Sequence, residues 1–309
     1  MTEPAMTEPV AGEPTHNDES PGRLPPIEFL RAGSLTVLGQ LTTASNATLL
    51  CEVAVEGLEP PDGPSSARSG ATDATGPRAV YKPIAGERPL RDFPPGTLAG
   101  REVASYLISE ALGWSLIPPT VFRDGPFGPG AVQWWIEDLD DTSAVIDLFP
   151  PALVPAGWAV VLEGSDPQGE AVSLAHADRI DLQRMAVLDL ILNNADRKAG
   201  HIMLQDGQLF GVDHGLTFHP ASKLRTVLWG WAGQKIPDHL LAEVRDLAAQ
   251  FSQSEPDRGA GAASLRAQLE KLLGPPELHA LRGRFTDLLN SGRFPDLPER
   301  RFGLPWPLW

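Results

Sequence analysis

Two aspartates stand in short motifs that could support phosphate chemistry. Asp196 directly follows a long apolar segment, in the sequence Asn194-Ala-Asp-Arg-Lys198, and Asp213 precedes a histidine and a glycine. Phosphoryl transfer requires a cation near the phosphates, a carboxylate that holds a metal ion, and a residue that orients the attacking hydroxyl. Asp196 could orient such a hydroxyl, and Asp213 could bind the metal.

A lysine and a glutamate could complete such a site. Lys82 lies in a short predicted strand, from which its ammonium group could reach a phosphate. Glu102 lies in the first turn of the helix predicted to follow, where it could hold the lysine in place. Either residue alone would suggest an exposed side chain, with the glutamate serving the helix dipole. In this strand-then-helix order, the two together indicate a functional pair.

The predicted elements explain how distant residues could meet. The first part of the chain predicts an antiparallel sheet with one helix between Thr97 and Gly113. Its apolar, β-rich segments lie at 34–55, 79–83, 118–122 and 131–136. The Gly-rich stretch 125–130 is expected to be a turn, because it precedes no helix and contains two prolines. From Pro150 onward the chain is expected to be helical, and the segment 181–193 is apolar on nearly all sides, which predicts a buried helix.

A hairpin is predicted between the two aspartates. Residues 201–205 and 208–212 flank Asp206-Gly207, a strong turn signal between alternating apolar residues. Because a hairpin brings its ends together, His201 and Asp213 are expected to be neighbours. Amphipathic segments follow at 238–252, 262–273 and 277–290, and the apolar tail 304–309 is expected to pack on the body of the protein.

Other side chains allow a competing hypothesis. Four residues could form a transition-metal site: His201, Asp213, His214 and His219. Such a site would favour a metal-dependent hydrolase, but it leaves Lys82 and Glu102 without a role. Asp189, inside the predicted buried helix, is expected to be a structural acceptor that ties down the following loop.

Composition narrows the classes of function. The chain has 309 residues, of which 42% are hydrophobic, and its formal net charge is -15. This size allows one large domain or two lobes, and an acidic surface disfavours binding to nucleic acid or to anionic membranes. The single cysteine, Cys51, excludes an internal disulfide and is expected to be buried. The first residues resemble neither a signal peptide nor an anchor, so a cytoplasmic location is expected.

Five motifs occur in a characteristic order: Lys82-Pro83, Arg101-Glu102 with the helix to Gly113, Pro118-Pro119-Thr120, Asp196-Arg197, and Val212-Asp213-His-Gly215. Over about residues 30–250 they resemble the phosphatidylinositol 3-/4-kinase-like superfamily. Its type II phosphatidylinositol 4-kinases, its HipA-like kinases and an uncharacterised actinobacterial group are the most similar members.

The resemblance implies an α+β, two-lobed protein-kinase-like fold. The expected N-lobe, residues 27–137, is an antiparallel sheet with one helix and a disordered insert at about 60–77. The expected C-lobe, residues 138–309, is mainly helical, and a disordered tail covers residues 1–26. ATP would bind between the lobes.

The resemblance also implies a role for each motif. Lys82 would bind the α- and β-phosphates, Glu102 would hold it, Asp196 would be the catalytic carboxylate, and Asp213 would bind magnesium. The adenine would lie against a hinge, and the phosphates would lie under a turn. The hinge residues are Trp135, Ile136 and Glu137, at the end of segment 134–137; the turn, 45–48, contains Ser45 and Asn46.

One position departs from the family pattern. His201 stands where the family has an asparagine as second metal ligand, and a nitrogen donor suits magnesium less well than manganese. The main hypothesis is an ATP-dependent phosphotransferase that uses magnesium or manganese and acts on a hydroxyl of a soluble protein or small molecule, with no stable membrane association. The alternative is a nucleotide-binding pseudokinase or regulator.

Overall fold

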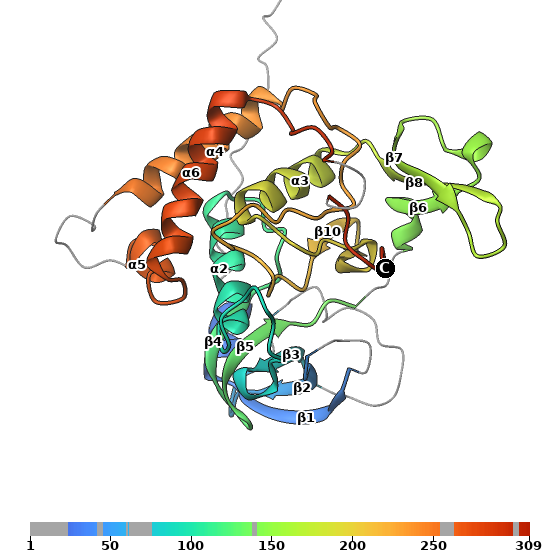
Figure 1. Ribbon diagram of the computed structural model, residues 1–309. Helices are drawn as coiled ribbons and strands as arrows, with labels where there is room; N and C mark the ends of the chain where they lie inside the picture. Colours follow the sequence, from blue (N-terminus) through green and yellow to red (C-terminus); the bar gives the residue numbers. More distant parts are fainter. Residues whose placement is uncertain are drawn as a thin grey trace, which may run out of the picture.

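The computed structural model describes residues 24–41, 46–59, 61, 76–137, 141–253, 263–298 and 303–309. Ser45, most of the expected N-terminal tail and most of the expected insert at 60–77 lie outside these residues. The described chain forms an α+β structure of two lobes, which confirms the expected fold class (Figure 1).

The N-terminal lobe is built on a five-stranded antiparallel sheet in the order β1-β2-β3-β5-β4. Its strands are β1 (Ser34–Gln40), β2 (Leu49–Ala54), β3 (Arg78–Pro83), β4 (Thr120–Gly125) and β5 (Gly128–Trp134). In β2, inward side chains alternate with outward ones, so Leu49, Cys51 and Val53 enter the core. The stretch 125–130 is the β4–β5 turn, as expected.

Two helices cover this sheet. The helix α2 (Leu98–Ala111) begins directly after Thr97, as predicted, and contacts β4 and β5. The Glu87 carboxylate accepts hydrogen bonds from the backbone N–H groups of Gly96 and Ala99, so it satisfies donors at the start of this helix. A helix that the sequence did not predict, α1 (Pro26–Ala32), places Phe29 edge-on against Trp134 in the sheet core.

The C-terminal lobe is centred on the buried helix α3 (Ile180–Leu192). The predicted hairpin follows as β9 (Ile202–Gln205) and β10 (Gln208–Gly211). Helices α4 (Asp238–Ser252), α5 (Leu265–Leu269) and α6 (Pro275–Ser291) lie on one side of α3 (Figure 1). The position of α3 fixes where the chain enters the Asp196 loop.

The prediction of helical structure from Pro150 onward is wrong up to residue 177. Three antiparallel strands form a second sheet in the order β6-β8-β7: β6 (Ile146–Phe149), β7 (Trp158–Ser165) and β8 (Ala171–Ala177). The β7–β8 turn contains Asp166, whose carboxylate accepts the N–H groups of Gln168 and Glu170, and Gly169 with a φ of 88°. This Asp-Pro-Gln-Gly turn between valine-containing segments was the overlooked signal.

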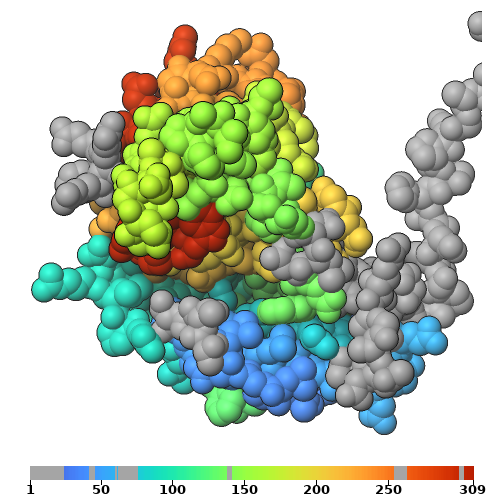
Figure 2. All heavy atoms as spheres, turned by 90° about the vertical axis from the view of Figure 1, so that its right-hand side faces the viewer, coloured from blue at the N-terminus to red at the C-terminus, as the bar shows by residue number. Residues whose placement is uncertain are grey.

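The C-terminal tail packs on the body only in part. Leu304 and Leu308 contact the main core, and the Leu308 carbonyl accepts the N–H of Ala199. Trp306, in contrast, is 86% exposed. In Figure 2 this tail (red) lies beneath the β6–β8 sheet (green) and above the N-terminal strands (blue).

Within the residues described, no helix combines the length and the apolar character that crossing a bilayer requires.

Candidate functional site

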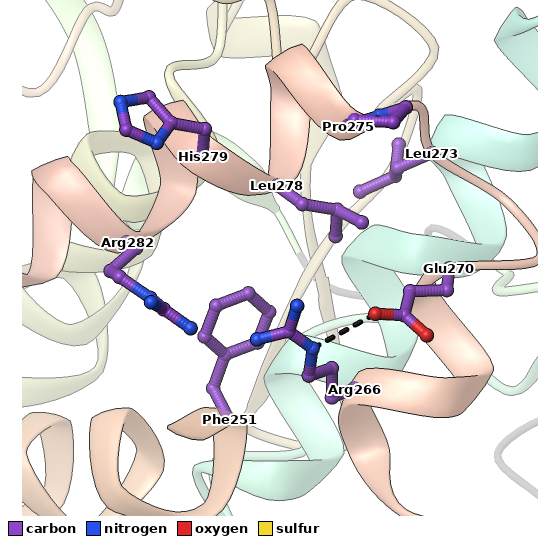
Figure 3. Close-up of a pocket in the computed structure, with 8 residues that line it drawn as sticks. All are labelled: Phe251, Arg266, Glu270, Leu273, Pro275, Leu278, His279 and Arg282. Atoms are coloured by element: carbon purple, nitrogen blue, oxygen red, sulfur yellow. Dashed lines mark hydrogen bonds and ion pairs between the residues drawn. The ribbon is translucent and has the colours of Figure 1, made fainter. Parts of the chain in front are cut away.

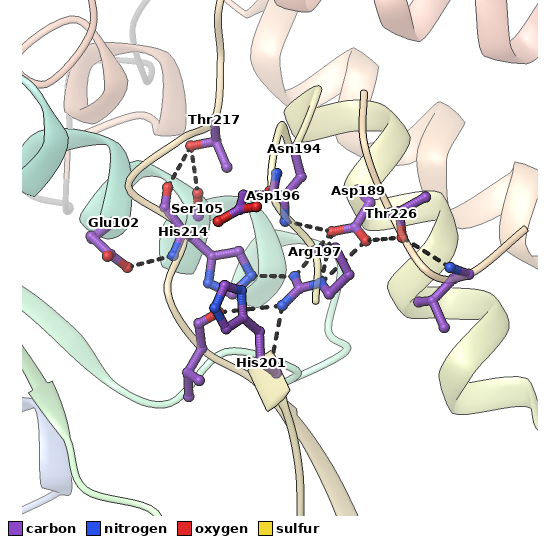
Figure 4. Close-up of polar contacts among 12 residues, drawn as sticks. Glu102, Ser105, Asp189, Asn194, Asp196, Arg197, His201, His214, Thr217 and Thr226 are labelled. Atoms are coloured by element: carbon purple, nitrogen blue, oxygen red, sulfur yellow. Dashed lines mark hydrogen bonds and ion pairs between the residues drawn. The ribbon is translucent and has the colours of Figure 1, made fainter. Parts of the chain in front are cut away.

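Three elements bring Lys82, Glu102 and Asp213 into contact. The ammonium group of Lys82, near the end of β3, donates hydrogen bonds to Glu102 and, at 2.9 Å, to Oδ1 of Asp213. Glu102 lies in the second turn of α2, one turn later than predicted, and its side chain is only 4% exposed. Its other oxygen accepts the backbone N–H of His214 at 2.9 Å (Figure 4). Glu102 therefore links the N-terminal lobe to the turn after β10.

The positive charge of Lys82 lies between the carboxylates of Glu102 and Asp213. Burial by itself would lower the pKa of Lys82, but the carboxylates of Asp213 and Glu102 outweigh burial and raise it. The Lys82 ammonium holds the pKa of Asp213 well below its usual range, so this carboxylate stays ionised. Asp213 is also 55% exposed. An ionised, accessible carboxylate can bind a cation or a cation-bound phosphate.

The hairpin places His201 beside Asp213, as predicted. Both turn residues, Asp206 and Gly207, have positive φ values of 51° and 76°, the geometry that a tight two-residue hairpin requires. His201 Nε2 then lies 3.5 Å from Oδ2 of Asp213. Burial lowers the pKa of His201 to about 4, so its imidazole is neutral near pH 7.

Asp213 itself has a left-handed backbone, with a φ of 59°. Only glycine adopts this region without strain, although aspartate tolerates it better than most residues. Immediately after this residue, the N–H of His214 points to Glu102.

Asp196 lies in the loop after α3. Its backbone N–H donates to the Asn194 side chain at 3.0 Å, and its Oδ2 lies 3.2 Å from the Lys198 ammonium. Burial raises the pKa of Asp196, and the negative charge of Asp213 adds to this shift. The two aspartates are thus close enough to interact electrostatically, although the sequence separates them by a whole hairpin.

A fully buried ion pair supports both aspartate motifs. Arg197 and Asp189 are each 0% exposed, and the Arg197 guanidinium donates to both Asp189 oxygens at 3.0–3.2 Å. Arg197 Nη2 also contacts His214 Nε2 at 2.6 Å, and Nη1 lies 3.3 Å from the carbonyl oxygens of His201 and Val212. Arg197 therefore connects α3 to both ends of the hairpin (Figure 4).

The sequence predicted the role of Asp189 in this ion pair but not the role of Arg197. Asp189 is the structural acceptor that was expected, and it also accepts from Asn194 and the Thr226 hydroxyl. Its partners are side chains, however, and the central role of Arg197 was not foreseen. Burial, followed by the Arg197 charge, lowers the pKa of His214 well below its usual value. His214 is consequently neutral and can accept from Arg197 at Nε2.

The other predicted nucleotide contacts that the structure describes lie on connections with hydrogen bonds to neighbouring elements. Asn46 Oδ1 accepts the N–H of Arg88 at 2.9 Å, which ties the turn before β2 to the segment after β3. The N–H groups of Trp135 and Glu137 donate to the Arg78 carbonyl and to the Gln205 side chain, both at 3.0 Å. Ile136 is buried. Segment 134–137 therefore joins the first sheet to the β9–β10 hairpin.

The four residues of the hydrolase hypothesis do not form one site. His214 is bound to Arg197, whereas the His219 ring packs edge-on against Phe93 with centroids 5.4 Å apart. Among the described residues, no group of three histidine, cysteine or acidic side chains could hold a metal ion. The donor chemistry instead fits a divalent cation held by Asp213 together with phosphate oxygens, because magnesium commonly uses one or two carboxylates plus substrate phosphates.

The helix that carries Glu102 is fixed to the C-terminal lobe. Arg101, 1% exposed, donates to Glu277 of α6 at 2.8 Å and to the Thr217 carbonyl at 2.6 Å. A Cβ at Gly100 would lie 2.9 Å from the carbonyl oxygen of Leu272. A larger residue at this position would therefore collide with the segment after α5, and glycine lets α2 lie this close to it. These contacts hold α2 in the position in which Glu102 meets Lys82.

Comparison with known proteins adds three findings. The family model described as phosphatidylinositol 3- and 4-kinase matches residues 180–258, which include both aspartates. Protein Rv2133c of Mycobacterium tuberculosis is 44% identical over 287 residues, which cover 90% of this chain and 93% of that protein. The crystal structure of the Helicobacter pylori proinflammatory kinase CtkA matches 84% of this chain and 93% of its own, with a TM-score of 0.35 and 12% identity.

Proposed function

The chain belongs to the phosphatidylinositol 3-/4-kinase-like superfamily, and from this premise we propose that it is an ATP-dependent phosphotransferase. The observation that carries the proposal is the contact of Lys82 with both Glu102 and Asp213, from three separate elements. A cation and an exposed carboxylate side by side suit a nucleotide phosphate and its metal. A regulator that binds ATP without turnover is the second candidate, favoured by the imidazole of His201 next to Asp213.

In this proposal ATP binds between lobes that divide at about residue 137. The adenine lies against Trp135, Ile136 and Glu137, and the phosphates lie between Lys82 and the segment of Asn46. Lys82 would exchange its bond to Asp213 for a bond to phosphate, while Glu102 keeps it in place. That exchange frees Asp213 to face the metal.

Magnesium or manganese, when bound, supplies positive charge that offsets the charge of the phosphates. Asp213 would hold the ion, and His201 is the neighbouring donor. Asp196 would accept a hydrogen bond from the acceptor hydroxyl and take its proton. Its burial favours this role, because burial raises its pKa and makes it a better base than an exposed aspartate.

The acceptor in this proposal is a hydroxyl of a soluble protein or small molecule. The chain carries 25 Lys and Arg residues against 40 Asp and Glu residues. A lipid kinase must approach an anionic bilayer, where each basic residue near the surface contributes about 1 kcal/mol of attraction. The strong acidic excess therefore favours a soluble acceptor over phosphatidylinositol in a membrane.

Metal-ATP should stabilise the folded protein if the proposed site is correct. At 100 times its dissociation constant, a ligand adds about 2.7 kcal/mol to the free energy of unfolding, which corresponds to a rise in Tm of several degrees. Differential scanning fluorimetry with magnesium-ATP and manganese-ATP measures this rise. Lys82→Met should reduce it, whereas Lys235→Met, at an exposed surface ion pair, should not. No rise with either metal at millimolar ATP would rule out nucleotide binding.

His201 should set the preference between metals. Asparagine at this position would offer an oxygen donor in place of the neutral imidazole nitrogen, and oxygen donors favour magnesium. His201→Asn is expected to raise the ratio of magnesium-supported to manganese-supported turnover several-fold. The matched substitution His239→Asn, at an exposed position on α4, should leave the ratio unchanged. An unchanged ratio in His201→Asn would show that His201 does not reach the metal.

A further inference from the structure

A pocket lies outside the proposed catalytic site. It has a volume of about 410 Å³ and is enclosed by the end of α4, by α5 and by the first half of α6 (Figure 3). Phe251, Leu273 and Leu278 form apolar walls, and Arg266, His279 and Arg282 add basic or polar groups. Its volume falls in the range of about 300–1,000 Å³ that small-molecule sites occupy.

Two arginines share one aromatic ring in this pocket. The guanidinium carbons of Arg266 and Arg282 lie 5.8 Å and 6.0 Å from the centre of the Phe251 ring. A cation–π contact is an attraction between the positive charge and the ring, so it does not use up the guanidinium N–H donors that could bind an anion. A purely structural role, in which the arginines only cover Phe251, would leave those donors to water.

The charges of the pocket do not balance. Arg266 donates to Glu270 at 2.8 Å. In the part of the chain that the structure describes, the guanidinium of Arg282 has neither an ion-pair nor a hydrogen-bond partner. Among the described residues that line the pocket, Glu270 is the only acidic one, so these residues leave one positive charge on a chain whose net charge is -15.

We propose that this pocket binds a small organic anion. A phosphate or carboxylate group would lie against Arg282 and the free edge of Arg266, because the planar guanidinium donors match both groups. An apolar body attached to that group would rest on Leu273 and Leu278. Both features are required. The two arginines favour an anion over a neutral molecule, and the apolar walls favour an organic anion over an inorganic one.

The position of the pocket links it to the catalytic helix. Pro275 and Leu278 line the pocket on either side of Glu277, which binds Arg101 of α2. Leu273 follows Leu272, whose carbonyl meets Gly100 of α2. An anion that shifts the turn between α5 and α6 would move Glu277 and, through it, Arg101. Glu102 follows Arg101 directly, so the carboxylate that binds Lys82 would move as well. This regulatory link rests on the proposed function, whereas the binding site does not.

Titration calorimetry of the full chain with phenyl phosphate tests the site without any nucleotide. Phenyl phosphate and benzoate test the two head groups, phenol removes the charge, and inorganic phosphate removes the apolar body. We expect phenyl phosphate or benzoate to bind, and to bind at least about tenfold more tightly than phenol or inorganic phosphate. Arg282→Gln should weaken binding by at least about tenfold, and Arg245→Gln, at an exposed position on α4 outside the pocket, should leave it unchanged. Absent binding, or equal binding by Arg282→Gln and the wild type, would overturn the proposal.

The link to α2 has a separate test. The affinity for manganese-ATP is measured with and without saturating phenyl phosphate, because coupling between two sites must appear as a change in affinity. The change should occur in the wild type and vanish in Arg282→Gln. A change that persists in Arg282→Gln would indicate competition at the nucleotide site, and an unchanged wild-type affinity would show no coupling; either result overturns the link.

Discussion

Replacing Asp196 with asparagine is expected to lower phosphotransfer by at least about 100-fold, while ATP affinity stays within about twofold of the wild type. Asparagine keeps the size of the side chain but cannot take the proton of an acceptor hydroxyl. The neighbouring Lys198, 3.2 Å from the Asp196 carboxylate, would also lose its acidic partner. The contacts of Lys82 with Glu102 and Asp213, which the proposal assigns to the nucleotide, do not involve Asp196.

Single-turnover rates and equilibrium ATP affinity, measured on the same preparations, separate these two effects. Asp206→Asn is a suitable control, because Asp206 occupies the tip of the β9–β10 hairpin and asparagine also tolerates its positive φ of 51°. Wild-type turnover in Asp196→Asn would show that another group receives the proton. Loss of ATP binding in that variant would instead place Asp196 among the ligands of the metal–nucleotide complex.

The sequence predicted the geometry of the site where local signals were strong. The Asp206-Gly207 turn fixed the hairpin, and the hairpin then required His201 and Asp213 to be neighbours. The order of strand and helix likewise predicted the contact of Lys82 with Glu102. In each case a local pattern determines which ends of the chain meet, so little tertiary information is needed.

Contacts that depend on tertiary packing were not predictable in the same way. The sequence paired Glu102 with Lys82, but it did not predict that the backbone N–H of His214 also donates to this buried carboxylate. The sheet of β6, β7 and β8 was missed because the Asp-Pro-Gln-Gly turn between β7 and β8 is a weaker signal than Asp-Gly. The complete burial of the Arg197 side chain could not be inferred from the sequence, because charged residues are rarely fully buried unless they are paired.

That buried pair should be among the most sensitive features of the protein. Asp189→Leu is expected to lower the free energy of unfolding by about 3–5 kcal/mol, because the substitution leaves the Arg197 charge buried without a carboxylate. It also removes the acceptor for Asn194 and Thr226. Arg197→Met should cost a similar amount, since Asp189 is then the uncompensated buried charge. The double variant should lose less than the two single losses combined, because neither buried charge remains.

Urea unfolding of the wild type, the two single variants and the double variant gives the coupling energy directly. The surface pair of Lys235 and Asp238, with side chains 66% and 80% exposed, provides a matched control: Asp238→Leu should change stability little, since solvent screens exposed pairs. Strictly additive losses would show that Arg197 and Asp189 act independently. Arg197 contacts α3 and both ends of the hairpin. Strong coupling, together with lost turnover in variants that remain folded, would therefore show that this ion pair positions the loop of Asp196 and the turn of Asp213 as one unit.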